Sequence, residues 1–120
     1  MELAIDKTGD VAVVTVSVEE LDASNAPELK RDIAPVLQAN MKVVLDLSRV
    51  RFMDSSGLGA MLSCLRQINA KKGELKLCGL SRQVRSAFEL VRLNRIFDIY
   101  PSRDGAVRAL QPLPGPPRDR

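Results

Sequence analysis

The stretch Phe52-Met53-Asp54-Ser55-Ser56-Gly57-Leu58-Gly59 lies between two apolar patterns of different period. Ahead of it, Val43-Val44-Leu45-Asp46-Leu47 is a nearly continuous apolar run, which is typical of a buried central strand. After it, apolar residues recur at helical spacing as far as Ile68. Two hydroxyls, a carboxylate and two glycines therefore stand where a strand passes into a helix. The free N–H groups and the dipole of a helix N-terminus favour an anion or a phosphorylated serine at such a turn.

The composition describes one folded domain with an aliphatic core. The chain has 120 residues, of which 45% are hydrophobic and 3% aromatic. The net charge of +3 comes without a clustered basic face interleaved with aromatics, which argues against nucleic-acid binding. No apolar run approaches the roughly 18 residues of a membrane span. We therefore expect neither nucleic acid nor a membrane as a partner.

The absence of histidine restricts the chemistry that this chain can perform. Ser-His and Cys-His nucleophile pairs and histidine-ligated metal sites are excluded, which argues against an enzyme. Cys64 and Cys78 fit no metal or redox spacing. Because no signal peptide precedes them, we expect both to be reduced core residues of a cytoplasmic protein. We also expect no metal, since histidine and a ligand spacing are missing, and no cofactor.

The N-terminal third predicts a β-hairpin followed by a helix. Strands are expected at residues 3–5 and 11–18, joined by the turn Thr8-Gly9-Asp10, and apolar residues on both sides of the second strand predict cover on both its faces. A polar loop at 19–25 leads to a helix capped by Ser24 or Asn25, with Glu28 placed to complete a capping box. Pro35 predicts a kink in this helix, which should end near residue 39.

The rest of the chain alternates strands and helices. The helix after Asp54 should stop at Gly73. We then expect a strand at 74–79, a helix capped by Ser81, a strand at 96–100 and a short helix from Pro101-Ser102. The order ββαβαβαβα predicts a single α/β domain over residues 1–110, with helices packed on a mixed sheet. Residues 111–120 hold four prolines and a glycine and predict a disordered Pro-rich tail.

Several known functional motifs do not match the central turn. A phosphate-binding P-loop needs a Lys after its last Gly, and none is present. A dinucleotide fingerprint needs a small residue where Leu62 stands. The hydrolase elbow Gly-x-Ser-x-Gly is missing. A metal site from Asp54 with Asp46 or Asp22 has no supporting spacing.

A purely local interpretation of the turn is also available. In it, Asp54 ends a strand, Ser55 or Ser56 caps the following helix, and Gly57 and Gly59 allow close packing. Residue spacing alone does not separate this interpretation from a functional one.

The turn resembles the signature of the STAS domain, which is found in bacterial anti-sigma-factor antagonists. The likeness extends over residues 1–110, from Glu20-Leu21-Asp22 and Ala26-Pro27-Glu28-Leu29 upstream to Gly73-Glu74-Leu75 and the Ser81 helix downstream. One departure is Glu19, because the family commonly has Gly before its Glu-Leu-Asp.

This resemblance implies a phosphorylation-switched binding protein rather than an enzyme. Unphosphorylated, such a protein binds an anti-sigma factor that is also an ATP-using serine kinase, and this releases the sigma factor. The kinase phosphorylates the serine directly after the Asp of the motif, which is Ser55 here, and a serine phosphatase reverses the step. Ser56 is the rival phosphoacceptor. The implied partner-binding surface is formed by Asp22, Asp54, Ser56, Gly57 and Leu58.

Two further classes of function stay open on the sequence. The chain could be a STAS subunit of another assembly, such as a partner switch with a non-sigma kinase, a stress-sensing assembly or a lipid-transport complex. The other class is a nucleotide-binding or hydrolytic enzyme, against which the missing phosphate-binding motifs and the missing histidine argue.

Overall fold

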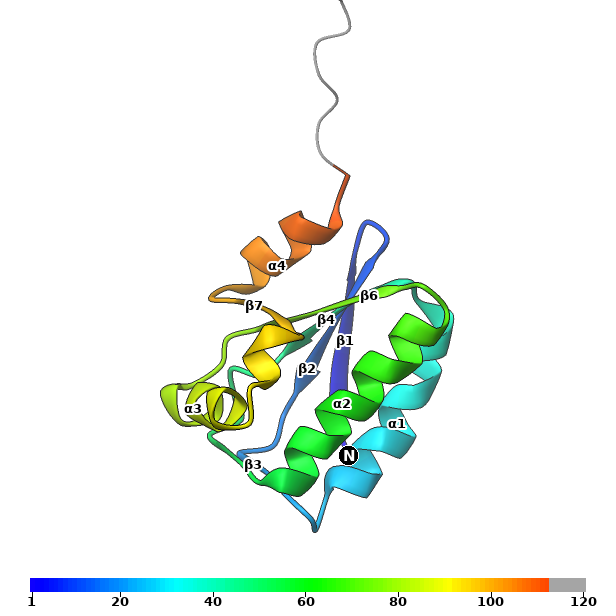
Figure 1. Ribbon diagram of the computed structural model, residues 1–120. Coiled ribbons are helices and arrows are strands. Elements are labelled where there is room, and N and C mark those ends of the chain that lie inside the picture. The colour runs from blue at the N-terminus through cyan, green and yellow to red at the C-terminus, as the bar shows by residue number, and fades with distance from the viewer. Residues whose placement is uncertain (113–120) are drawn as a thin grey trace, which may run out of the picture.

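The computed structural model describes residues 1–112 and folds them around a five-stranded sheet (Figure 1). The predicted order of strands and helices is confirmed. The structure adds two short strands, β3 and β5, and one 3-10 helix, η1. In chain order the elements are β1 (Leu3–Thr8), β2 (Val11–Val16), β3 (Glu20–Leu21), α1 (Ala26–Ala39), β4 (Lys42–Asp46), β5 (Phe52–Met53), α2 (Ser55–Ala70), β6 (Glu74–Cys78), α3 (Arg82–Leu90), η1 (Leu93–Arg95), β7 (Asp98–Tyr100) and α4 (Arg103–Leu110).

The main sheet has the strand order β1-β2-β4-β6-β7 and is mixed, as predicted. β1 pairs antiparallel with β2 through the predicted turn, whereas β2, β4, β6 and β7 run parallel. Their carboxyl ends therefore reach the same edge of the sheet. A second, two-stranded sheet joins β3 to β5 in parallel near that edge.

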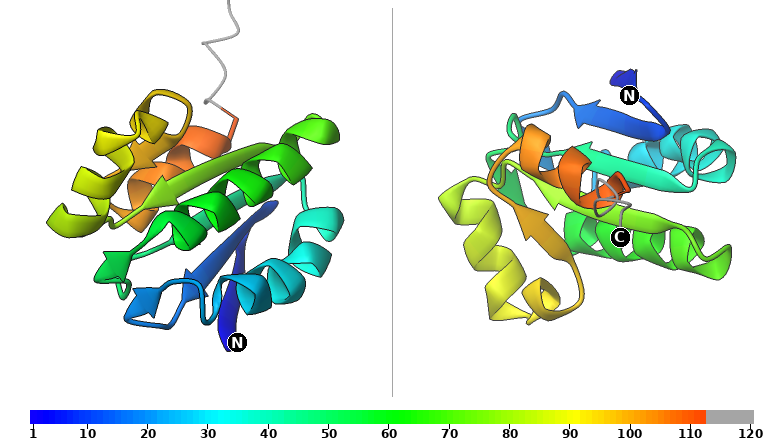
Figure 2. Two further views of the ribbon diagram at one scale, coloured as in Figure 1. Left: turned by 60° about the horizontal axis from the view of Figure 1, so that its bottom comes forward. Right: turned by 90° about the horizontal axis from the view of Figure 1, so that it is seen from above.

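Helices cover the two faces of the sheet unequally. α1 and α2 lie side by side on one face, and α4 lies on the other (Figures 1 and 2). The larger core fills the α1–α2 side and includes Leu29, Leu45 and Met61. The smaller one joins Val13 and Val44 to the apolar face of α4. β2 is thus covered on both faces, as its two-sided apolar pattern predicted.

The start of α1 differs in detail from the prediction. Asn25 occupies the N-cap position, but its side chain makes no capping hydrogen bond. Its Oδ1 instead accepts from the N–H of Asp22 at 2.9 Å. The predicted capping box is wrong, because the carboxylate of Glu28 pairs with the amino group of Met1. The helix runs through Pro35 and ends at Ala39, where the prediction placed its end.

The end of α2 lies earlier than the predicted stop at Gly73. The helix ends at Ala70, and Lys72 adopts the left-handed conformation, with φ of 63°. Gly73 is needed for another reason: a Cβ there would lie 2.7 Å from the carbonyl oxygen of Met41. Lys71 donates to the carbonyl oxygens of Leu37 and Gln38 at 2.6 Å each, so it binds the C-terminal end of α1.

An ion pair fixes α4 to the sheet. Arg103 Nη2 donates to Asp46 Oδ2 at 3.0 Å and to Thr15 Oγ1 at 2.8 Å. Burial opposes ionisation of Asp46, but hydrogen bonds from Ser48 and Arg103 outweigh it and hold the pKa of this carboxyl below its usual range. The predicted strand at 96–100 begins only at Asp98, because the N–H groups of Ile96 and Phe97 still donate to the carbonyl oxygen of Leu93 in η1. Of the predicted Pro-rich tail, residues 111–120, the part from residue 113 onward lies outside the described residues.

Candidate functional site

The turn between β5 and α2 is built around the carboxylate of Asp54. Its Oδ1 accepts from the N–H of Ser56 at 2.9 Å and of Gly57 at 3.1 Å. Asp54 is therefore the N-cap of α2, with extended backbone geometry. The local interpretation assigned that role to Ser55 or Ser56, and this is wrong, because the carboxylate already occupies the amides that a serine cap would bind.

The two serines differ in their exposure. Ser55 is the first residue of α2 and is exposed, whereas Ser56 is half-buried. Within residues 1–112, the structure gives neither hydroxyl a hydrogen-bond partner. Ser55 is thus the more accessible of the two serines.

The next two residues of the predicted surface, Gly57 and Leu58, are buried and pack under the turn. Gly57 is buried, and a Cβ there would lie 2.5 Å from the carbonyl oxygen of Leu21 and from Cγ of Met53. Leu58 is 8% exposed and belongs to the larger core. The predicted close packing is therefore confirmed at Gly57. It is wrong at Gly59, where a Cβ would meet no atom within 4 Å.

Asp22 lies on a second loop that contacts the turn. The N–H of Ala23 donates to Asp54 Oδ2 at 3.3 Å, which joins the two loops. Asp22 Oδ1 accepts from the hydroxyl and the N–H of Ser24, and these hydrogen bonds lower the pKa of the Asp22 carboxyl. The region predicted as a loop also contains β3, whose pairing with β5 aligns the two segments. The structure thus places Asp22 and Asp54 on adjoining loops.

Phe52 is an exposed apolar residue beside the turn that the sequence reasoning did not assign to the site. Its relative exposure is 49%, whereas the following Met53 is 4% exposed. The alternation follows from β5 itself, because successive side chains of a strand point to opposite faces. Helical and strand periodicity could not reveal this, since β5 has two residues.

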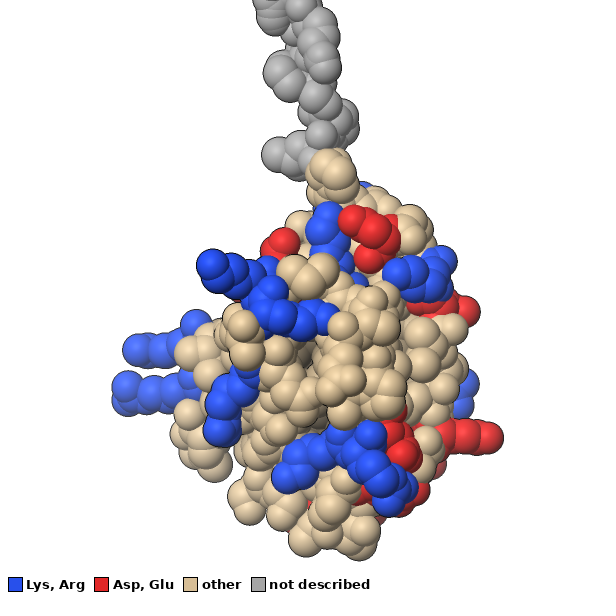
Figure 3. Space-filling view, turned by 90° about the vertical axis from the view of Figure 1, so that its right-hand side faces the viewer, with Lys and Arg blue, Asp and Glu red and all other residues tan. Residues whose placement is uncertain are grey.

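The charged groups around the turn have separate partners. Asp46 pairs with Arg103, and Asp54 binds backbone amides, so the metal site considered for Asp54 with Asp46 or Asp22 finds no support in their contacts. The described part of the chain contains no group of three or more side chains placed to hold a metal ion. On the face drawn in Figure 3, Lys and Arg stand in separate groups among acidic and uncharged residues.

The cysteines are free and buried, as predicted. Burial raises the pKa of the Cys64 thiol to about 12 and that of Cys78 to about 11. Among residues 1–112, no helix combines the length and apolar character needed to cross a membrane.

Comparison with known proteins identifies relatives along nearly the whole chain. The STAS domain model matches residues 2–106. An anti-sigma F factor antagonist of Paenibacillus polymyxa is 32% identical over 94% of this chain and 97% of that protein. An anti-sigma-B factor antagonist of Bacillus subtilis is 30% identical over 74% of this chain and 82% of that protein. The crystal structure of an anti-sigma factor antagonist from Mycobacterium paratuberculosis superposes with a TM-score of 0.81, at 28% identity, over 91% of this chain and 92% of that one.

Proposed function

This chain belongs to the STAS domain family, and on that premise we propose that it is an anti-sigma factor antagonist switched by phosphorylation of Ser55. Unphosphorylated, it binds an anti-sigma factor that is also an ATP-using serine kinase, and the sigma factor is released. The kinase then phosphorylates Ser55 and the complex separates, until a serine phosphatase restores the binding form. The curated relatives are named as antagonists of anti-sigma factors, which favours this role over that of a subunit in a different assembly.

The observation that carries the proposal is the position of one hydroxyl. Ser55 is exposed at the first position of α2, directly after the capping carboxylate of Asp54. The adjacent surface is open at Gly59, where an added Cβ would meet nothing within 4 Å. A kinase can therefore approach the hydroxyl without unfolding any part of the turn.

The same geometry explains how a phosphate would act as a switch. A phosphate adds about −1.5 to −2 charges at neutral pH. The amides of Ser56 and Gly57 are already bound by Asp54, so the phosphate would stay at the surface instead of turning inward to them. The helix dipole favours it in the free protein by up to about 1 kcal/mol. The fold should therefore tolerate the modification.

In a complex, the same phosphate would be placed against a partner. It would have to lose water there, next to the carboxylate of Asp54 and to the adjoining loop that carries Asp22. A loss of about 3 kcal/mol weakens binding roughly a hundredfold. The proposed docking surface comprises Asp22, Asp54, Ser55 and Ser56, together with the exposed ring of Phe52. Gly57 and Leu58 act by holding this surface in place.

Phosphosite mapping tests the assignment of the acceptor. The full chain, Ser55→Ala and Ser56→Ala are each incubated with the cognate anti-sigma factor kinase and ATP, and the products are digested and analysed by mass spectrometry. We expect one phosphate, on Ser55, which Ser55→Ala abolishes and Ser56→Ala retains. Phosphate on Ser56 alone would overturn the assignment.

Two binding variants test the switch separately from the acceptor. Ser55→Ala should bind the kinase like the unmodified chain, whereas Ser55→Asp should bind less tightly, because its carboxylate reproduces part of the phosphate charge. Equal binding of these two variants would contradict a switch that acts through charge.

A further inference from the structure

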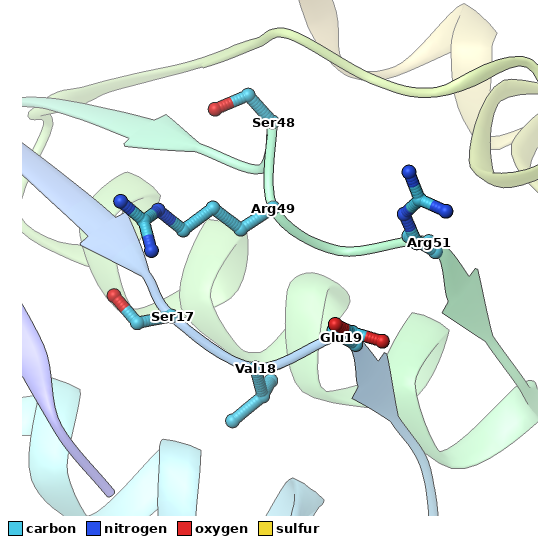
Figure 4. A pocket seen from close by; sticks show the side chains of 6 residues that line it. All are labelled: Ser17, Val18, Glu19, Ser48, Arg49 and Arg51. Carbon is cyan, nitrogen blue, oxygen red and sulfur yellow. The ribbon is translucent and has the colours of Figure 1, made fainter.

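A polar hollow of about 370 Å³ opens at the carboxyl ends of β2 and β4, on the loops that follow these strands. Figure 4 shows the side chain of Arg49 extending toward Ser17, whereas the side chain of Arg51 lies on the other side of the hollow and points away from Arg49. A second hollow, of about 340 Å³, shares Ser48 and Arg51 with the first. It continues to Arg82 at the start of α3. The two hollows therefore adjoin at Ser48 and Arg51, and we call them together the arginine groove.

The charge of the arginine groove is unbalanced. Three arginines line it, Arg49, Arg51 and Arg82, against the single carboxylate of Glu19. The ion pairs within residues 1–112 include none of these three guanidinium groups, although other arginines, such as Arg31 and Arg103, are paired. A concave site with excess positive charge and free guanidinium donors is suited to an anion.

The backbone beneath the groove is firmly held. Val50, which lies between Arg49 and Arg51, is fully buried, and its N–H donates to the carbonyl oxygen of Leu47 at 3.0 Å. The N–H of Arg51 donates to the carbonyl oxygen of Glu19 at 2.7 Å, which ties the two loops together. The loop after β4 is joined to β6 by the N–H of Leu47, which donates to the carbonyl oxygen of Cys78 at 3.0 Å. The arginine side chains thus start from fixed positions on either side of the hollow.

We propose that the arginine groove is a binding site for a small phosphate-type oxyanion, either inorganic phosphate or the phosphate of a small ester. Guanidinium groups bind such oxyanions through paired, charge-assisted hydrogen bonds. The hydroxyl of Ser17 adds a neutral donor. The volume exceeds that of a bare tetrahedral ion, so the organic part of an ester also has room. The site needs no modification of Ser55 and is independent of the switch proposed above.

Titration of the ¹⁵N-labelled full chain with sodium phosphate, and separately with O-phosphoserine, at low ionic strength tests the site by NMR. Saturable shifts are expected for amides of residues 17–19, 48–51 and 81–83. Arg49→Gln or Arg51→Gln should each weaken binding roughly tenfold, as expected for loss of one hydrogen-bonded charge pair. Glu19→Gln should tighten binding, because it removes the one carboxylate of the groove.

Arg66→Gln is the matched control, since it removes one exposed positive charge from α2, outside the groove. It should change the affinity less than twofold. Tighter binding of O-phosphoserine assigns the site to esters, and tighter binding of phosphate assigns it to the free ion. The proposal is overturned if neither probe gives saturable shifts, or if Arg66→Gln weakens binding as much as the groove variants.

Discussion

Alanine substitution at the two glycines of the α2 N-terminus gives a matched test of how the turn is packed. Gly57 and Gly59 both lie within α2, so either change gains about 1 kcal/mol of helix propensity. At Gly59 the new Cβ meets no atom within 4 Å, and the gain should appear as added stability. At Gly57 it would lie 2.5 Å from the carbonyl oxygen of Leu21 and 2.5 Å from Cγ of Met53.

The two contacts at Gly57 differ in how easily they can be relieved. The side chain of Met53 can rotate away, but the Leu21 carbonyl accepts the N–H of Asp54 at 3.2 Å and is held by that bond. Relief therefore requires backbone movement, at a cost of about 1–3 kcal/mol. Gly57→Ala should be less stable than Gly59→Ala by that amount, or by about 4 °C in Tm for each kcal/mol.

Urea denaturation followed by circular dichroism measures the free energy of unfolding of both variants against the unmodified chain. We expect Gly59→Ala to shift the midpoint upward and Gly57→Ala to shift it downward or leave it unchanged. Equal stabilisation by both substitutions would refute the close approach of α2 to the β3 backbone.

Three further predictions follow from the contacts of single side chains. Asp54→Ala should lower the free energy of unfolding by about 1–2 kcal/mol through loss of the cap, and Asp54→Asn by about 0.5 kcal/mol through loss of charge alone; equal losses in urea would contradict the capping geometry. Arg103→Gln should cost about 1–3 kcal/mol at neutral pH. Because the pKa of Asp46 is lowered in the folded chain, the stability that the Asp46–Arg103 pair contributes is lost as the pH falls through this lowered pKa. The loss of stability in Arg103→Gln should therefore shrink at acid pH, and a loss that does not change with pH would contradict the role of the pair. Burial raises the thiol pKa of Cys64 to about 12 and of Cys78 to about 11, so a thiol reagent should label them after unfolding and not before.

The long elements of the fold could be predicted because each buries a regular pattern. The apolar run that became β4 lies in the middle of the sheet, where both faces are covered, and β2 shows the same two-sided pattern. α2 could be predicted from its apolar spacing alone. The alternation of strands and helices then predicted the parallel part of the sheet, and the turn signal at Gly9 predicted the β1–β2 hairpin.

The short elements could not be predicted, because their backbone is determined by tertiary contacts. β3 and β5 have two residues each, which is too short for any periodicity, and they form by pairing with one another. η1 begins after Arg92, a non-glycine residue with φ of 63°, and nothing in the local sequence indicates that conformation. The same holds at Lys72, where the adjacent Gly73 was the expected end of the helix.

The site was predictable in part. Its position at a helix N-terminus followed from the order of strand, polar turn and helix, and the structure places Asp22 and Asp54 on adjoining loops there. The identity of the cap did not follow, because Asp and Ser are both favoured at that position. The exposure of Ser55 required the structure, since two adjacent serines cannot be told apart by sequence pattern.

The most direct measurement of the central claim compares two forms of the same chain. The affinity of the unphosphorylated chain and of the chain phosphorylated at Ser55 for the cognate anti-sigma factor kinase is measured by calorimetry, with circular dichroism confirming that both are folded. The account predicts two folded proteins whose affinities differ by about a hundredfold, with the phosphorylated form binding more weakly. Equal affinity of the two forms would contradict it.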